Sequence, residues 1–263
     1  MIYTDQLGRK VELAETPKRI ISLVPSQTEL LYDLGLRNEV IGITKFCIHP
    51  KEWYESKTKV GGTKTIDFEK IKELNPDLII GNKEENDQQQ IEELSKHYNV
   101  WMSDCNNLKD AFTMMVYVGA LVGKNKEGIN LKLEIEFLFN QFATREASQI
   151  KIAYFIWQNP FMVAARNTFI DDMLTRCGLI NVFASEVNMR YPEVSAEQIT
   201  KANPQVIFLS SEPFPFSEKH IQQFQSICPE AKIVLVDGEL FSWYGSRLLK
   251  APDYYTGLIQ TVM

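Results

Sequence analysis

The feature of this sequence that most constrains its fold is an internal repeat with an offset of 128 residues. Residues 68–80 read Phe-Glu-Lys-Ile-Lys-Glu-Leu-Asn-Pro-Asp-Leu-Ile-Ile, and residues 196–208 read Ala-Glu-Gln-Ile-Thr-Lys-Ala-Asn-Pro-Gln-Val-Ile-Phe. The identities pair Glu69 with Glu197, Ile71 with Ile199, Asn75 with Asn203, Pro76 with Pro204 and Ile79 with Ile207. Both copies have a helical pattern that ends at Asn-Pro, followed by an apolar run typical of a buried strand. The chain is therefore predicted to contain one α/β unit twice.

The beginnings of the two halves agree as well. An apolar strand pattern at 19–24 is followed by Ser26-x-x-Glu29, which predicts a capping box and a helix that ends at Gly35. A further strand pattern at 40–44 completes a βαβ unit, and such units form parallel sheets. In the second half, strand 152–157 precedes Thr168-x-x-Asp171 and a helix that ends at Gly178. The two halves of an α/β protein often resemble each other by chance, because both alternate strands and helices. The Asn-Pro pair at the same position in both halves argues against coincidence here.

The remaining segments complete a two-lobed prediction. We expect a hairpin over 2–13, helices over 67–74, 87–97 and 108–122, and strands over 77–80, 100–102 and 232–236. Strand patterns stop between 108 and 148, where residues 127–147 read as one long helix. The predicted fold is α/β, with two Rossmann-like parallel-sheet lobes joined by one long backbone helix and a ligand cleft between the lobes. The predicted domains are 1–124, the linking helix 125–148, and 149–263.

Charge and cysteine spacing exclude several classes of protein. The 28 Lys and Arg residues against 34 Asp and Glu give a net charge of −6, which disfavours nucleic-acid binding. No apolar run approaches the roughly 18 residues of a membrane span. The four cysteines are far apart and form no C-x-x-C motif. The first residues lack the apolar core of a signal peptide, so we expect either a cytoplasmic protein or a trimmed periplasmic or cell-surface one.

Aromatic side chains gather in the loops that follow the predicted strands. In open parallel sheets, ligands bind beyond the carboxyl ends of the strands, so these loops are the candidate site. The aromatic residues there are Phe46, Trp157, Phe161, Tyr191, Phe214, Phe216, Phe241, Trp243 and Tyr244. Such a group is suited to a broad, flat, partly apolar ligand. The alternative is that some of these side chains pack as core between the lobes, and we expect about half of them to do so.

Charged residues in the same loops predict contacts to acidic groups of a ligand. The candidates are Arg166, Arg190 and Arg247, because the guanidinium fork binds carboxylates and phosphates. Alternatively, these arginines pair within the lobes with Glu84, Glu85, Glu193 or Glu212. The segment 239–247 is the strongest predicted ligand loop, since it combines Trp243 and Tyr244 with hydroxyl groups and Arg247.

Metal-binding and enzymatic signatures are sparse. Cys47 and His49 on one strand-end loop could supply half of a metal site, but C-x-H is common by chance. We expect no intrinsic cofactor and a ligand that carries its own metal, cobalt or iron. Familiar nucleophile, zinc-protease and nucleotide-binding motifs are absent. A chelatase-like enzyme using His49 and Glu212, or an intracellular metal or tetrapyrrole carrier, is the main alternative, and a protein-interaction module is the third.

The chain resembles the class III, helical-backbone substrate-binding proteins of ABC importers, and within them the vitamin B12, iron–siderophore and haem receptors. The resemblance spans about residues 18–255. It rests on residues 19–29 (Arg-Ile-Ile-Ser-Leu-Val-Pro-Ser-Gln-Thr-Glu), on 68–80 and on 191–197 (Tyr-Pro-Glu-Val-Ser-Ala-Glu). It implies a monomeric importer component that binds a cobalamin-like corrinoid, a ferric siderophore or haem, and that is neither an enzyme nor membrane-spanning.

The resemblance also implies roles for individual residues. Glu69 and Glu197 match the positions that offer one glutamate per lobe to arginines of the permease. Phe46, Phe161 and Tyr191 match aromatic positions of the B12 pocket. This sequence departs from the pattern where two pocket tryptophans are replaced, at about Thr63 and Asn82, and where a late Asp and Arg pair becomes Ser242 with a displaced Arg247. The resulting set of expected ligand residues is Phe46, Trp157, Phe161, Arg190, Tyr191, Glu212, Trp243, Tyr244 and Arg247.

Overall fold

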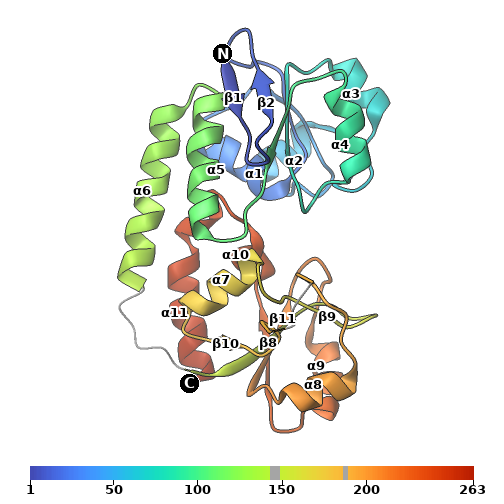
Figure 1. The fold of residues 1–263 in the computed structure, drawn as a ribbon, viewed down its shortest axis with the longest axis vertical. Helices are drawn as coiled ribbons and strands as arrows, with labels where there is room; N and C mark the ends of the chain where they lie inside the picture. Colours follow the sequence, from blue (N-terminus) through green and yellow to red (C-terminus); the bar gives the residue numbers. More distant parts are fainter. Residues whose placement is uncertain (143–148, 186–188) are drawn as a thin grey trace. The chain divides into compact units, whose positions relative to one another are not determined.

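The computed structural model describes residues 1–142, 149–185 and 189–263. The chain divides into two compact units (Figure 1). Unit 1 comprises Met1–Cys105, Lys109–Ile135 and Tyr244–Arg247, and unit 2 comprises Asn106–Leu108, Glu136–Trp243 and Leu248–Met263. The short segment Tyr244–Arg247 therefore belongs with unit 1 although its neighbours in sequence belong with unit 2. No sequence pattern predicted this return.

Unit 1 is built on a five-stranded parallel sheet with the order β5-β4-β3-β6-β7. The strands are β3 (Ile20–Ser22), β4 (Val40–Ile43), β5 (Thr58–Lys59), β6 (Leu78–Asn82) and β7 (Val100–Ser103). The strand order reverses at β3, which lies between β4 and β6. The predicted N-terminal hairpin is confirmed as the antiparallel pair β1 (Ile2–Thr4) and β2 (Lys10–Glu12).

The helices of unit 1 follow its strands, as the βαβ prediction requires. They are α1 (Pro25–Asp33), α2 (Lys51–Ser56), α3 (Phe68–Leu74) and α4 (Gln88–Ser95), with most of α5 (Leu108–Leu121) and the first part of α6 (Asn125–Phe142). Helices α5 and α6 run side by side (Figure 1), because Gly119 and Gly128 let the backbones approach closely. A Cβ at Gly128 would lie 2.8 Å from the carbonyl oxygen of Met115. The last part of the predicted linking helix, residues 143–148, lies outside the described residues.

Unit 2 repeats the parallel sheet with the order β10-β8-β11-β12, and β9 pairs antiparallel with β8. The strands are β8 (Lys151–Trp157), β9 (Met162–Val163), β10 (Ile180–Asn181), β11 (Val206–Ser210) and β12 (Lys232–Val236). The helices are α7 (Phe169–Arg176), α8 (Ala196–Ala202), α9 (Glu218–Ile227), α10 (Gly238–Ser242) and α11 (Ala251–Val262), with a 3-10 turn η1 at Ser246–Leu249. The predicted class, α/β with two Rossmann-like parallel-sheet lobes, is confirmed.

The internal repeat is confirmed residue by residue. Helices α3 and α8, and strands β6 and β11, begin and end at positions 128 residues apart. Each helix is capped by a side chain that accepts a backbone N–H, from Asp67 in one copy and Ser195 in the other. Each helix ends at an asparagine in the left-handed conformation, with φ of 42° at Asn75 and 49° at Asn203. Asparagine tolerates this conformation, which explains the shared Asn-Pro stop.

Two local predictions are wrong. The predicted capping box at Ser26–Glu29 does not form, because α1 begins two residues earlier than predicted, at Pro25, and its N-cap is Val24, without a side-chain cap. Proline at the first helical position presets φ and has no N–H to leave unsatisfied. The predicted ligand loop 239–247 also differs, since most of it is taken up by α10 and the start of η1. Asp237 caps α10 by accepting the N–H of Glu239, a start signal that the strand-to-loop interpretation overlooked.

Candidate functional site

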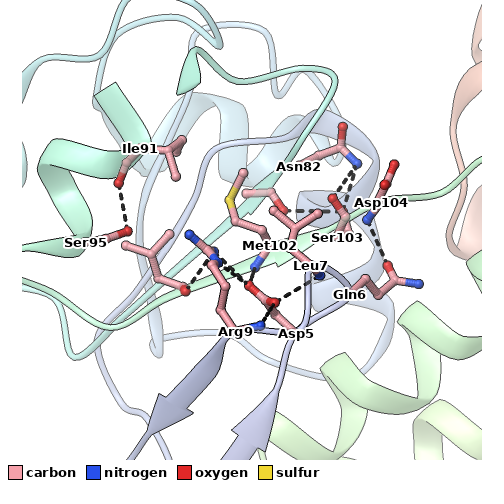
Figure 2. A network of polar contacts seen from close by, with 12 residues as sticks. Asp5, Gln6, Leu7, Arg9, Asn82, Ile91, Ser95, Met102, Ser103 and Asp104 are labelled. Atoms are coloured by element: carbon pink, nitrogen blue, oxygen red, sulfur yellow. Dashed lines mark hydrogen bonds and ion pairs between the residues drawn. The ribbon is translucent and has the colours of Figure 1, made fainter. Parts of the chain in front are cut away.

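Buried polar side chains occupy the carboxyl edge of the sheet in unit 1. Asn82, the last residue of β6, donates from Nδ2 to the carbonyl and hydroxyl oxygens of Ser103, at 3.2 and 2.9 Å (Figure 2). Its Oδ1 accepts the backbone N–H groups of Glu84 and Glu85, at 2.8 and 3.1 Å. Asn82 is therefore fully used in shaping the loop after β6. At this position, where the resembling pattern has a pocket tryptophan, the side chain here serves the loop structure.

The N-terminal hairpin supports the same edge from the side of β7. The buried carboxylate of Asp5 accepts from Nε and Nη2 of Arg9, at 2.8 and 2.7 Å, and from the N–H of Met102 at 3.3 Å (Figure 2). Gln6 Oε1 accepts the N–H of Asp104 at 3.1 Å. These bonds tie the hairpin turn to the end of β7. The hairpin therefore positions the strand-end loop rather than forming a separate element.

The first turn of α1 lies at the point where the strand order of unit 1 reverses. Ser26 and Gln27 are buried there, and Ser26 Oγ and Gln27 Oε1 have no hydrogen-bond partner among the described residues. Gln27 Nε2 donates to the hydroxyl of Ser103. Gly245 packs against this turn, since a Cβ added to it would lie 3.1 Å from the carbonyl oxygen of Ser26. The returning segment Tyr244–Arg247 thus covers part of α1.

Arg247, predicted to contact an acidic ligand group, forms an ion pair within unit 1. Its Nε and Nη2 donate to the two carboxylate oxygens of Glu29, at 2.8 and 2.7 Å. The two side chains are only 10% and 13% exposed. A bidentate pair in such surroundings neutralises the guanidinium and fixes its orientation. The partners are 218 positions apart in the sequence, which explains why no local pattern revealed the pair.

The predicted stacking residues divide into exposed and buried sets. Phe46 is 50% exposed in unit 1, with Lys45 Nζ 5.1 Å from its ring centre, and Trp157 is 39% exposed in unit 2. Trp243 and Tyr244 are buried, at 5% and 4%. The two exposed rings present surface that a ligand could cover. The two buried rings are packed in the protein as the structure describes it.

Three further candidates are brought together in unit 2. The carbonyl oxygen of Phe161 accepts the N–H of Val194, and that of Arg190 accepts the N–H of Ala165, at 2.9 and 2.8 Å. These bonds place the loop containing Tyr191 beside the β8–β9 hairpin. The ring of Phe161 packs on the aromatic core of unit 2, with its centroid 5.2 Å from that of Phe224.

Glu212 is a buried carboxyl group at the end of β11. Burial raises its pKa to about 7, and the neighbouring charges of Glu239 and Asp237 add to this effect. Hydrogen bonds from the Ser242 hydroxyl and from Trp243 oppose it. Gly238 makes room for this side chain, since a Cβ there would lie 2.6 Å from Cγ of Glu212. Glu212 thus sits against α10 as a weak acid that titrates near neutral pH.

A pocket of about 490 Å³ opens beside this group, at the carboxyl ends of β11 and β12. Its lining residues are Ser211, Phe216, Leu235, Val236, Asp237 and Glu239. The pocket is shallow and open to solvent, and it lies among the strand-end loops of unit 2. The strand-end argument indicated these loops, but it did not single out Asp237 or Glu239.

Cys47 and His49 do not gain metal-binding partners in the structure. Cys47 is buried, its sulfur lies 3.1 Å from the hydroxyl oxygens of Thr28 and Thr44, and burial raises its thiol pKa. No three His, Cys, Asp or Glu side chains gather around a possible metal position within 1–142, 149–185 and 189–263. Cys47 therefore acts as a small hydrogen-bonding core residue. All four cysteines are buried free thiols.

Comparison with protein families identifies the fold. A model of the periplasmic binding protein family matches residues 20–228. The chain belongs to this family. Such proteins bind ligands, and the chelatase-like or intracellular-carrier interpretation is not favoured. None of the described helices combines the length and apolar character needed to cross a membrane.

Proteins similar to this periplasmic binding protein include vitamin B12-binding and haem-binding proteins. A vitamin B12-binding protein of Vibrio cholerae is 28% identical over 196 residues, which cover 73% of this chain and 70% of the relative. One of Pectobacterium carotovorum is 25% identical over 240 residues, covering 89% and 86%. The structure of the periplasmic vitamin B12 binding protein BtuF of Vibrio cholerae gives a TM-score of 0.78 at 23% identity, covering 94% and 98%. The haem-binding protein BhuT with two haems gives 0.79 at 18% identity, covering 94% and 99%.

In this periplasmic binding protein, the two glutamates expected to dock a permease occupy equivalent positions. Glu69 and Glu197 are the second residues of α3 and α8, and both are exposed. A carboxylate in a helix first turn is favoured by the helix dipole without any partner. The repeat therefore presents one solvent-exposed negative charge per unit at matching places. Their role in docking stays a prediction.

Proposed function

We propose that this chain is the substrate-binding protein of an ABC importer and that its ligand is a metal-carrying organic molecule: a corrinoid, haem or a ferric siderophore. The observation that carries the proposal is the repeated strand-end edge, where each unit presents an exposed aromatic ring, Phe46 on unit 1 and Trp157 on unit 2. Exposed aromatic rings in strand-end loops are suited to a broad, partly apolar ligand. The names of the relatives, which include vitamin B12-binding and haem-binding proteins, support the same class.

In this proposal the metal, cobalt or iron, arrives with the ligand, and the protein contributes no cofactor of its own. Its side chains supply apolar surface, hydroxyl groups and carboxyl groups instead. The pocket beside β12 adds an apolar floor from Phe216 and Leu235 with carboxylates from Asp237 and Glu239. Such a mixture orients an organic ligand by a few polar contacts over a larger apolar area.

The proposal also assigns Glu69 and Glu197 to permease docking. Both carboxylates are exposed, and the repeat places them at corresponding positions of the two units. Two single charges on separate units would favour encounter with a positively charged permease surface and fix its register. The binding protein would act as a monomer in this complex.

The proposal is tested by direct binding. We expect the purified protein to bind at least one of haemin, cyanocobalamin and ferric desferrioxamine, with a dissociation constant in the micromolar range or below by isothermal titration calorimetry. Phe46→Ala should weaken this binding by about tenfold, since exposed anchors gain most of their burial from the ligand. Tyr54→Ala is the matched control, because Tyr54 is 42% exposed in the same unit but lies on α2. Absence of binding to all three probes contradicts the proposal.

A further inference from the structure

The structure holds one tryptophan whose exposure has no structural explanation. All four tryptophans lie in the described ranges, and Trp53, Trp101 and Trp243 are at most 5% exposed, whereas Trp157 is 39% exposed. Trp157 is the last residue of β8. An indole that is left partly open to water keeps apolar surface unburied, so the exposure of Trp157 calls for a functional account.

The register of the two sheets gives Trp157 a counterpart in unit 1. Ile20 pairs with Leu78, and Ile152 pairs with Val206, while Leu78 and Val206 are equivalent in the repeat. Ile20 therefore corresponds to Ile152, and five residues later Pro25 corresponds to Trp157.

The two copies differ sharply at this position. In unit 1 the chain turns immediately into α1, whose first residue is Pro25. In unit 2 the chain instead continues through residues 158–167, which include β9, before α7 begins. The longer connection leaves the end of β8 free of a helix, and the indole occupies that place. Because β8 lies between β10 and β11, this is also the point where the strand order of unit 2 reverses, the usual ligand position in such sheets.

The indole is held in place by its own loop. Its Nε1 donates to the carbonyl oxygen of Asn159 at 3.2 Å. Its ring lies 5.6 Å from that of Phe214, at an interplanar angle of 68°, and Phe214 is in turn 4.7 Å from Phe216. The N–H group is therefore already satisfied, and what remains open is π surface. A ring fixed in this way loses little conformational freedom when a ligand covers it.

We infer that Trp157, braced by Phe214, is the stacking residue of unit 2 and that it favours the conjugated macrocycle of a tetrapyrrole over a compact ferric siderophore. This inference rests on the proposed function, since it concerns the same ligand edge. A macrocycle offers a broad conjugated face that an indole can cover by offset stacking. A hydroxamate siderophore wrapped around its iron, such as ferric desferrioxamine, offers no comparable face. Haem and corrinoids share the macrocycle, and the experiment separates them.

The test combines affinity with direct detection of contact. Wild type, Trp157→Phe and Trp157→Ala are titrated by calorimetry with haemin, cyanocobalamin and ferric desferrioxamine. We expect one of the two tetrapyrroles to bind best, Trp157→Ala to weaken it by about tenfold or more, and Trp157→Phe to stay within about threefold, because phenylalanine keeps a stacking face. Ile180→Ala, which removes a comparably exposed apolar side chain at the start of β10, should leave the affinity unchanged.

A tryptophan-specific benzylating reagent followed by peptide mapping reports the contact itself. The ligand-free protein should be labelled at Trp157, and the tetrapyrrole should protect it. The inference is overturned if Trp157→Ala, with an unchanged melting temperature, binds the tetrapyrrole as wild type does, or if Trp157 stays labelled in the complex. It is also overturned if ferric desferrioxamine is the preferred probe, or if Trp157→Phe loses as much affinity as Trp157→Ala. In each of these cases the protein still binds a metal-carrying ligand, so the proposed function survives. Failure of wild type to bind any probe contradicts both.

Discussion

Glu212 should make the stability of this protein depend on pH in a way that one substitution removes. Its carboxyl group is buried beside α10, which raises its pKa from 4.5 to about 7. The folded chain therefore holds this proton more tightly than the unfolded chain. Unfolding releases the proton between pH 4.5 and about 7, and the free energy of unfolding falls as the pH rises through this window.

The size of the effect follows from the difference between the two pKa values. Each tenfold change in proton affinity corresponds to about 1.4 kcal/mol, so the difference between 4.5 and about 7 corresponds to about 3 kcal/mol. This is a large share of the roughly 5–15 kcal/mol by which proteins are stable. Glu212→Gln keeps the shape and an acceptor for the Ser242 hydroxyl but cannot ionise. The variant should therefore gain stability relative to wild type as the pH rises.

The assay is urea unfolding of wild type and Glu212→Gln from about pH 4 to about pH 8.5, compared as a difference between the two proteins. The difference in the free energy of unfolding between the two proteins should be constant at the acidic end. As the pH rises it should change in favour of the variant by up to about 3 kcal/mol, and it should become constant again above about pH 7.5. Glu218→Gln, which removes an exposed carboxylate from the first turn of α9, is the matched control and should show no such change.

One result would refute the burial argument for Glu212. If the difference between wild type and Glu212→Gln does not vary with pH by more than about 0.5 kcal/mol, the carboxyl group is not desolvated in solution. A ¹³C titration of the Glu212 side chain gives an independent measurement, since its midpoint should lie near 7 rather than 4.5. A titration midpoint near 4.5 would show that the Glu212 carboxyl group is exposed to water.

Three further predictions concern other parts of the chain. Arg247→Met should lower the free energy of unfolding by about 2–4 kcal/mol, because it leaves the Glu29 carboxylate nearly buried without its partner; a double-mutant cycle in urea should show strong coupling, and additive single effects would contradict the ion pair. Glu69→Lys with Glu197→Lys should weaken permease association in a pull-down while ligand affinity stays unchanged, whereas loss of ligand binding would assign these glutamates to the ligand site. Gly238→Ala should destabilise the protein by about 1–3 kcal/mol in thermal unfolding, since its Cβ would overlap two neighbouring side chains, and an unchanged melting temperature would show that the turn relaxes.

Most of the fold could be predicted from local sequence patterns. The helix α3 and its copy α8 were predictable because the caps Asp67 and Ser195, and the stops Asn75 and Asn203, are all local signals that act within one turn. The parallel sheets followed from βαβ connectivity, which permits few alternatives. These features depend on neighbours in sequence, so a single sequence contains them.

Contacts between residues that are far apart in the sequence explain where the predictions were wrong. Glu29 was interpreted as part of a capping box because Ser26 stands three residues before it, but its carboxylate binds Arg247 from the far end of the chain. The same contact removed Arg247 from the free cations of the predicted ligand loop. A local motif and a distant partner compete for the same side chain, and only the folded structure decides between them.

The exposure of the candidate site residues could not be predicted from the sequence either. Trp157 ends a predicted strand and Trp243 follows one, and both stand near other aromatic residues in sequence. Yet Trp243 is buried at the end of α10, whereas Trp157 is exposed. The difference arises from Asp237, which starts a helix after β12 and turns Trp243 inward. After β8 no helix begins until Thr168 provides a cap.

The comparison of the two copies separates structural roles from binding roles. Positions that are alike in both units, such as Glu69 and Glu197, have the same fold around them and are suited to a partner that meets each unit in the same way. A small ligand does not require equivalent residues in the two units, because its own two faces need not be equivalent. The positions that differ, Pro25 in unit 1 and Trp157 in unit 2, need not serve such a shared partner, and Trp157 is the one assigned above to the proposed ligand. On this argument, exchanging the loop 158–167 for a direct entry into a helix should abolish ligand selectivity while leaving the parallel sheet of unit 2 intact.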